Sequence, residues 1–277
     1  MKLFISRLVF FYLLMTLFGL SLLSAQASQS ELPMSQFNFQ GFVPESRHER
    51  GRDEPADLIR LAVDPDLEWV LHRVIDRYQE NSQRPFRIHV GHHQQVEDFL
   101  DDGEVFDIVI SGRMRDAHQF VRRGLATESR VWAVGRVALW APLETVRSTS
   151  VLRLQNQAIG LPPATSPYHQ AALDILERHE MLEEMQPRLQ EATPFQNYFE
   201  LIRTREIPIG FLPYQRTVEG GIAQQRAVLK MQANHHAPII HAATLMRAGE
   251  NREEVNLFWA HLFGPAASRV LREAGLD

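Results

Sequence analysis

Short apolar runs and helical stripes of apolar residues alternate along the chain from residue 58 onward. Runs typical of buried strands occupy residues 59–63, 86–90 and 107–111. Between and after them, apolar residues recur every three or four positions at residues 67–78, 96–103 and 113–124, as on one face of a helix. This order of strand and helix predicts an α/β fold with a parallel sheet.

The second half of the chain repeats this kind of pattern after an extended stretch. Residues 131–142 contain two apolar segments around Gly135 and Arg136, and such a piece can cross between two lobes. Strands are then predicted at residues 158–161, 208–212 and 228–231, with helices at 168–180 and 195–203. Residues 239–246 read as extended chain that returns to the first lobe, and residues 256–274 as one final helix.

The N-terminal residues have the pattern of a secretory signal peptide. Lys2 and Arg7 precede an apolar run over residues 8–23, and Ala25 and Ala27 are the small residues that a signal peptidase reads. We predict cleavage after Ala27 and a periplasmic location. A retained membrane anchor is the alternative, although the run is shorter than the roughly 20 residues that span a bilayer. Residues 28–57 are polar, with no sustained period, and predict a mobile lead-in.

Composition narrows the possible functions. The chain has no Cys, so an exported form has neither disulfides nor Cys-ligated metals, and lipid attachment through a Cys is excluded. A net charge of −5 argues against nonspecific nucleic-acid binding, which needs a basic face. Twelve His residues leave a metal site to be considered.

One strand end is a candidate ligand site from the residues alone. Ser111 and Gly112 lie between a predicted buried strand and a predicted helix. Open α/β sheets bind their ligands at the carboxyl ends of parallel strands, so the Ser111 hydroxyl is placed to contact a ligand. The alternative is that Ser111 only caps the following helix.

Residues 58–277 resemble the molybdate-binding family of periplasmic solute-binding proteins of ABC importers. The resemblance implies a two-lobed type II periplasmic-binding-protein fold, each lobe a mainly parallel sheet flanked by helices, joined by a two-strand hinge. It places lobe 1 at residues 58–136 plus 237–277 and lobe 2 at residues 137–236. The segments that carry the resemblance are IRLAVDPDLEWVLHRVIDRY, FDIVISGRMRDAHQFVRRGLA, VGRVALWAP, IGLPPATSPYHQAAL, IPIGFLPYQRT and FWAHLFGPAASRVLREAGL.

The resemblance also implies how such a protein works. It would be a monomer without cofactor or enzymatic activity that captures a small ligand, a molybdate-like oxyanion, by hinge closure. It would then deliver the ligand to an ABC permease in the inner membrane, with no nucleic-acid partner. Carried over position by position, the family's ligand-binding pattern falls on Asp66, on His93, near Thr165, on Tyr168, on a backbone amide near Phe195, and on Pro213, with Tyr214 one residue further along.

The two Ser positions of the family pattern differ in this sequence, because Asp66 and His93 stand where the family usually has Ser. A Ser hydroxyl can donate a hydrogen bond to an oxyanion, whereas an ionised Asp can only accept one. Two unit charges about 4 Å apart repel by roughly 4 kcal/mol at an effective dielectric constant near 20, so a dianion would meet about twice that. A protonated His93 would offset part of this repulsion.

Several alternatives remain open from the sequence. Asp66 and His93 are equally explained as helix-capping or loop residues, and Tyr168 and Tyr214 as lobe surface. A protein that uses the same scaffold to bind a metal ion or an organic solute, or as a sensor or partner-binding module, is also possible. The residue types of a hydrolytic triad are present in Ser111, His93 and Asp66, but no G-x-S-x-G motif surrounds Ser111. A divalent metal site would draw on Asp66, His92, His93 and His169, with His235 and His236 further away.

Overall fold

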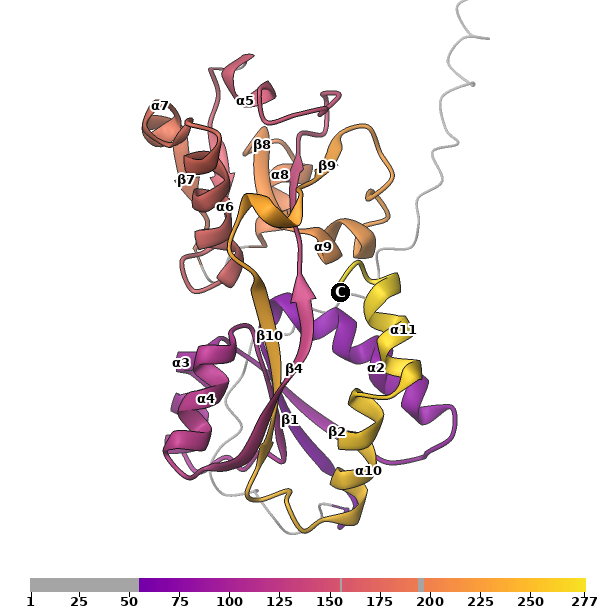
Figure 1. The fold of residues 1–277 in the computed structure, drawn as a ribbon. Coiled ribbons are helices and arrows are strands. Elements are labelled where there is room, and N and C mark those ends of the chain that lie inside the picture. The colour runs from indigo at the N-terminus through magenta and orange to yellow at the C-terminus, as the bar shows by residue number, and fades with distance from the viewer. Residues whose placement is uncertain (1–54, 155, 194–196) are drawn as a thin grey trace, which may run out of the picture. The chain divides into compact units, whose positions relative to one another are not determined.

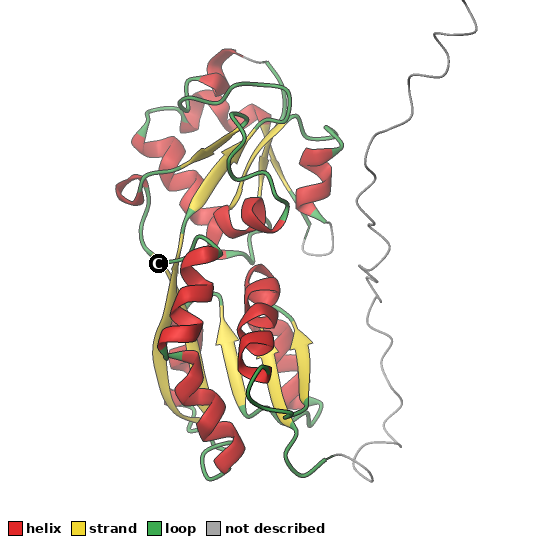
Figure 2. Cartoon of the chain, turned by 90° about the vertical axis from the view of Figure 1, so that its right-hand side faces the viewer, coloured by secondary structure: helices red, strands yellow, loops and turns green. Residues whose placement is uncertain are grey.

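The computed structural model describes residues 55–154, 156–193 and 197–277. In this part of the chain, two five-stranded sheets each carry helices on both faces (Figures 1 and 2). No helix among these residues is long and apolar enough to cross a membrane. The predicted signal peptide, most of the predicted lead-in and Phe195 lie outside the described residues.

The first sheet has the strand order β2-β1-β3-β10-β4. Strand β1 pairs in parallel with β2 and β3, whereas β10 is antiparallel to β3 and β4, so four strands run one way and β10 runs against them. The strands span Ile59–Val63 (β1), Phe86–Val90 (β2), Ile108–Ser111 (β3), Ala126–Gly135 (β4) and Ile239–Met246 (β10).

Alternation of side chains along the strands divides the core of this sheet into two layers. Ile59, Leu61 and Val63 of β1 face one cluster, while Ala62 faces the other. Helices α2, α10 and α11 cover the first face, and α3 and α4 cover the second (Figure 1). The helices span Glu68–Gln79 (α2), His93–Asp101 (α3), Met114–Arg122 (α4), Glu253–Leu262 (α10) and Pro265–Glu273 (α11), and a 3-10 turn, η1, spans Pro65–Leu67.

The second sheet has the order β7-β6-β8-β5-β9. Strands β6, β7 and β8 are parallel, and β5 lies antiparallel between β8 and β9. Here too a single strand runs against the other four. The strands span Val137–Trp140 (β5), Ile159–Leu161 (β6), Leu189–Glu191 (β7), Ile209–Pro213 (β8) and Val228–Lys230 (β9).

Helices again form two layers around this sheet. The cluster that contains Ile175 and Leu176 of α6 packs on the face to which Val137 and Leu139 point, whereas Ile202 of α8 packs with Ala138 on the other. The helices and turns span Val151–Leu154 (α5), Pro167–Arg178 (α6), Leu182–Met185 (α7), Gln186–Arg188 (η2), Tyr198–Arg203 (α8), Tyr214–Glu219 (α9) and Ala233–His235 (η3).

The chain passes between the two sheets twice. Strand β4 of the first sheet ends at Gly135, and β5 of the second sheet begins two residues later. The return runs from β9 through η3 into β10, which lies beside β4 over eight residue pairs (Figure 1). The prediction of an α/β fold with two mainly parallel sheets and two crossing segments is therefore confirmed.

The predicted single helix over residues 256–274 is wrong. The structure has two helices here, because α10 ends at Leu262 and α11 begins at Pro265. Pro265 occupies the first helical position, where its fixed φ and missing N–H fit, but it could not continue the preceding helix. Gly264 precedes it in an extended conformation and ends the first helix cleanly.

Candidate functional site

Asp64, His92 and Ser111 lie at the carboxyl ends of three parallel strands of the first sheet. Asp64 follows β1, His92 follows β2, and Ser111 is the last residue of β3. The Asp64 carboxylate caps η1 by accepting from the Asp66 backbone N–H at 3.1 Å, and its other oxygen lies 3.2 Å from His92 Nδ1. This sheet edge is where α/β proteins bind ligands.

A hydrogen bond joins this edge to the second sheet's helices. The Ser166 hydroxyl donates to Oδ2 of Asp66 at 2.6 Å. Ser166 is also the N-cap of α6, because its Oγ accepts from the Tyr168 backbone N–H at 3.2 Å. The Asp66 carboxylate therefore lies at the N-terminus of a twelve-residue helix, where the helix dipole favours a negative charge.

Two further side chains link the same elements through backbone carbonyls. Arg113 Nη2, just before α4, donates to the carbonyl oxygens of Ala164 at 3.2 Å and Ser166 at 2.9 Å. Gln215 Nε2 of α9 donates to the Asp66 carbonyl oxygen at 3.1 Å. These bonds hold the backbone of Asp66 and the backbone just before α6 in place.

A buried chain of hydrogen bonds runs behind Asp66. His241 Nδ1 lies 2.9 Å from the Gly112 carbonyl oxygen, and His241 Nε2 lies 2.9 Å from Tyr168 Oη. Burial lowers the pKa of His241 to about 4, so the ring is neutral at physiological pH. The carbonyl requires Nδ1 to carry the proton, so Nε2 accepts from the Tyr168 hydroxyl. Tyr168 Oη in turn accepts from Gln215 Nε2 at 2.7 Å.

The surroundings of Asp66 raise the pKa of its carboxyl group. Burial, followed by the charge of Asp64, raises the pKa of Asp66 to about 6, against the smaller opposing effects of the Ser166 hydrogen bond, His92 and Arg216. Burial lowers the pKa of His92, but its hydrogen bond to Asp64 and the Asp64 charge outweigh this and leave the pKa raised. Asp66 therefore changes its charge near pH 6 and is mostly ionised at pH 7.5.

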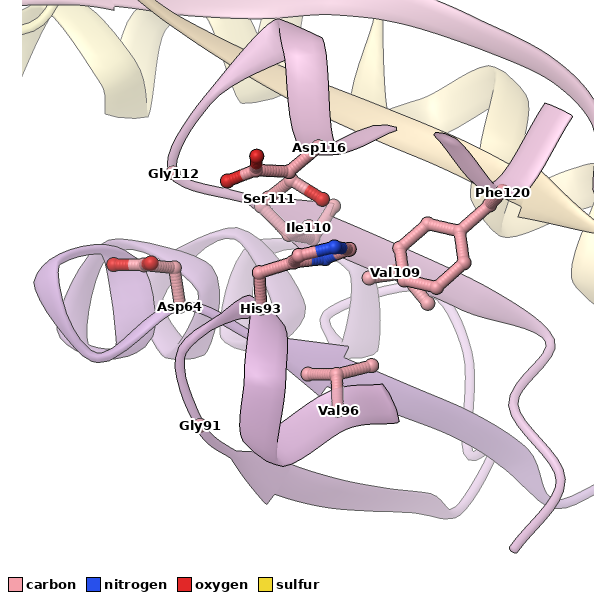
Figure 3. Close-up of a pocket in the computed structure, with 10 residues that line it drawn as sticks. All are labelled: Asp64, Gly91, His93, Val96, Val109, Ile110, Ser111, Gly112, Asp116 and Phe120. Atoms are coloured by element: carbon pink, nitrogen blue, oxygen red, sulfur yellow. The ribbon is translucent and has the colours of Figure 1, made fainter. Parts of the chain in front are cut away.

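A small pocket opens beside this edge within the first sheet's own elements (Figure 3). Its volume is about 10 Å³, space for about one water molecule. Ser111, His93, Asp64 and Asp116 contribute its polar lining, and Phe120 packs edge-on against the His93 ring at 5.3 Å between centroids. His93 Nδ1 is buried and has no hydrogen-bond partner among the described residues.

Of the six predicted ligand-binding side chains, the structure places Asp66 and Tyr168 where the two sheets' elements meet. Ser111 and His93 line the neighbouring pocket instead. Thr165 is exposed, and its neighbour Ser166 makes the contact to Asp66.

Tyr214 lies away from Asp66, at the start of α9. Lys230 Nζ lies 4.4 Å from the centroid of its ring, and the ring packs against Gly275 near the C-terminus. The next residue in the chain, Gln215, is the one that reaches Asp66. In both the Thr165 and the Tyr214 regions, the contact is thus made one residue further along the chain.

Sequence reasoning missed Ser166, Gln215, His241 and Asp64. A signal for Ser166 was present, because Ser followed by Pro is a typical start of a helix and the N-cap lies at the sheet edge. Asp64 likewise precedes Pro65 as a cap. Nothing in the local pattern marks Gln215 or His241, which join the site only through tertiary contacts.

The residues proposed for a metal site or a hydrolytic triad do not gather. Among the described residues there is no group of three or more His, Cys, Asp or Glu that could hold a metal ion. His93 Nε2 lies 3.3 Å from Gln119 Oε1, and Asp66 accepts from Ser166. Within the described ranges, no hydrogen bond joins Ser111 to His93 or to Asp66.

Comparison with known proteins identifies relatives of the whole folded region. Residues 59–277 match the model of a family described as bacterial extracellular solute-binding protein. The molybdate-binding protein ModA of Rhodobacter capsulatus is 22% identical over 183 residues, which cover 64% of this chain and 71% of that protein.

Two solved structures show a similar fold. The periplasmic molybdate-binding protein of Azotobacter vinelandii has a TM-score of 0.71 at 17% identity, covering 79% of this chain and 98% of its own. The sulfate-binding protein SubI of Mycobacterium tuberculosis has a TM-score of 0.61 at 12% identity, covering 79% of this chain and 86% of its own. At these identities the likeness concerns the fold.

Proposed function

Since this chain belongs to the family of bacterial extracellular solute-binding proteins, we propose that it captures a small oxyanion of the molybdate kind between two lobes. The lobes are residues 58–136 plus 237–277 and residues 137–236. The captured ion is handed to an ABC permease in the inner membrane. The protein acts as a monomer in the periplasm after cleavage behind Ala27, and it performs no chemistry on its cargo.

The observation that carries this proposal is the hydrogen bond between Ser166 and Asp66. A hydroxyl at the N-cap of α6 donates to an anionic oxygen supplied by the other sheet's elements, at 2.6 Å. An oxyanion that enters between the lobes would accept from the same hydroxyl and benefit from the same helix dipole. The Ser111 hydroxyl lies at the end of β3, on the same edge of the first sheet as Asp64 and Asp66.

The relatives support the class of cargo. The proteins named above from Rhodobacter capsulatus and Azotobacter vinelandii are described as molybdate-binding, and SubI as sulfate-binding. Molybdate and sulfate are both small tetrahedral oxyanions, which neutral hydroxyls and backbone N–H groups can bind.

Capture requires the lobes to separate and close again. The pocket lined by Asp64, His93 and Ser111 holds only about 10 Å³, too little for a tetrahedral oxyanion. The contacts of Arg113 and Gln215 to backbone carbonyls join the two sheets' elements and would break on opening. The crossing segments near Gly135 and before β10 are the places where such a hinge motion would occur.

Isothermal titration calorimetry tests this function. The full chain would be expressed in a bacterial host, purified from the periplasmic fraction, and titrated with molybdate, tungstate, sulfate and phosphate at pH 5.0 and pH 7.5, with Zn²⁺ as the control cation. Saturable binding of at least one oxyanion, weakened by Ser166→Ala, is expected. Heat with Zn²⁺ alone, or with none of these ions, would overturn the proposal and direct the search to other ligands.

A further inference from the structure

Asp66 presents a negatively charged acceptor at the place where the cargo's own oxygens would lie. An ionised carboxylate has lone pairs but no hydrogen to donate. Its neighbour Asp64 adds a second negative charge on the same turn and accepts from the Asp66 backbone N–H. The two carboxylates repel an anion that has no hydrogen-bond donor of its own.

Hydrogen bonds hold the Asp66 backbone in place at this edge, and the Ser166 hydroxyl holds its side chain. Its backbone N–H is bound to Asp64 Oδ1 at 3.1 Å, and its backbone carbonyl accepts from Gln215 at 3.1 Å. The edge is tightly packed around Asp64, because a Cβ at Gly112 would lie 2.6 Å from Asp64 Oδ2. A ligand that contacts Ser166 therefore also meets the Asp66 carboxylate.

No positive side chain neutralises Asp66 directly in the described part of the chain. His92 is bound to Asp64, the Arg113 guanidinium donates to backbone carbonyls, and Arg216 of α9 pairs with Glu219. The other titratable groups that face this region are Tyr168 of α6 and His241 of β10, and both remain neutral at physiological pH. The proton that Asp66 requires must come from solvent or from the ligand.

We propose that Asp66 is a specificity-determining residue that selects, among small tetrahedral oxyanions, those carrying an O–H group, such as hydrogen phosphate or a monoalkyl phosphonate, over sulfate at neutral pH. The inference rests on the proposed function. The ligand's O–H donates to Asp66, while Ser166 donates to another ligand oxygen. A site built around such an acceptor rejects an analogue that lacks the donor, because the carboxylate is then left facing a second anion.

The selectivity can be measured as the ratio of phosphate to sulfate affinity at pH 7.5. We expect the wild-type protein to prefer phosphate by roughly 10- to 100-fold, the range for one hydrogen bond to a charged group. Asp66→Ser supplies a donor and should bring the ratio close to parity by strengthening sulfate binding. Asp66→Asn, which keeps the side-chain volume, should move the ratio in the same direction. Asp101→Asn, on an exposed carboxylate at the end of α3, is the matched control and should leave the ratio unchanged.

The same idea predicts how sulfate binding depends on pH. The pKa of Asp66 is raised to about 6 by burial and by Asp64. When Asp66 is protonated, its own O–H can donate to sulfate. Between pH 7.5 and pH 5.0 the protonated fraction of such a group rises about 30-fold, so sulfate affinity should rise by a similar factor in the wild type. Asp66→Ser should show no comparable rise.

The outcomes separate the two proposals. If sulfate and phosphate bind but the wild type and Asp66→Ser share one affinity ratio and one pH profile, the proposed role of Asp66 is wrong, whereas the proposed oxyanion-binding function stands. If neither ion binds either protein at either pH, while unfolding curves show that both are folded, the proposed oxyanion function fails and the inference fails with it.

Discussion

The Ser166 hydroxyl donates to Oδ2 of Asp66 across 100 residues of sequence, at 2.6 Å. Ser166 caps a helix that packs on the second sheet, whereas Asp66 belongs to the turn that follows β1 of the first. One hydrogen bond thus couples a helix start in one half of the fold to a sheet edge in the other.

Removing the Ser166 hydroxyl should destabilise the protein measurably. Ser166→Ala loses both the N-cap bond to Tyr168 and the bond to Asp66, so we expect the free energy of unfolding at pH 7.5 to fall by about 1–3 kcal/mol. Urea denaturation measures the change. Thr165→Ala, at the exposed neighbouring position, should change it by less than about 0.5 kcal/mol. Equal losses in the two variants would show that Ser166 has no special role.

The two buried Tyr hydroxyls should respond differently to deletion. Tyr168→Phe leaves buried His241 Nε2 without its partner and removes one of the two acceptors of Gln215 Nε2, so it should cost about 1–3 kcal/mol. Tyr198 Oη is buried without a hydrogen-bond partner among the described residues, so Tyr198→Phe should be neutral or slightly stabilising. Denaturant unfolding of both variants tests the contrast, and an equal cost at the two sites would contradict the hydrogen-bond chain through His241, Tyr168 and Gln215.

Asp66 should give the stability a pH dependence that Asp66→Asn removes. Because its folded pKa, about 6, lies above the unfolded value of 3.8, the folded state binds more protons between these pH values. The contribution of Asp66 is therefore fully present below about pH 4 and is lost as the pH rises through 6. His241, with a pKa lowered to about 4, contributes the opposite slope over part of this range.

The difference between the two proteins isolates the Asp66 contribution, since His241 titrates in both. Unfolding free energies of the wild type and Asp66→Asn should be compared from pH 4 to pH 7.5. The wild type should lose stability relative to the variant as the pH rises to about 6, and the difference should then stay level. Parallel curves across the whole range would mean that the pKa of Asp66 is not raised on folding.

Gly112 should be intolerant of a side chain because of Asp64. A Cβ at residue 112 would lie 2.6 Å from Asp64 Oδ2 and 2.8 Å from its Cγ, so Gly112→Ala must displace the carboxylate that caps η1. We expect a loss of about 1–3 kcal/mol. In an Asp64→Ala background the same substitution should cost much less. A double-mutant cycle measures this coupling, and additive effects would show that the clash is relieved elsewhere.

The local pattern of the sequence determined most of the secondary structure and the class of fold. Apolar runs and stripes report directly on which residues must be buried, so the predicted strands of both sheets and helices such as α2 and α6 lie where the structure has them. Short elements such as α5, α7 and β7 escaped prediction because three or four residues carry too little periodicity. The break at Gly264 and Pro265 was also present in the sequence, although the stripe of apolar residues concealed it.

The tertiary structure alone decided which side chains meet in the candidate site. Asp66, Ser166 and Gln215 come together from segments 100 and 149 residues apart, and the His241 contact to Gly112 joins residues 129 apart. Side-chain periodicity does not encode such pairings. It specifies which face of a helix or strand is buried, but not which other element lies against the end of that helix or strand. For that reason the sequence located the regions near Ser166 and Gln215 only to within one residue. The contact between the Asp66 carboxylate and the start of α6 followed only from the packing of the two sheets' elements.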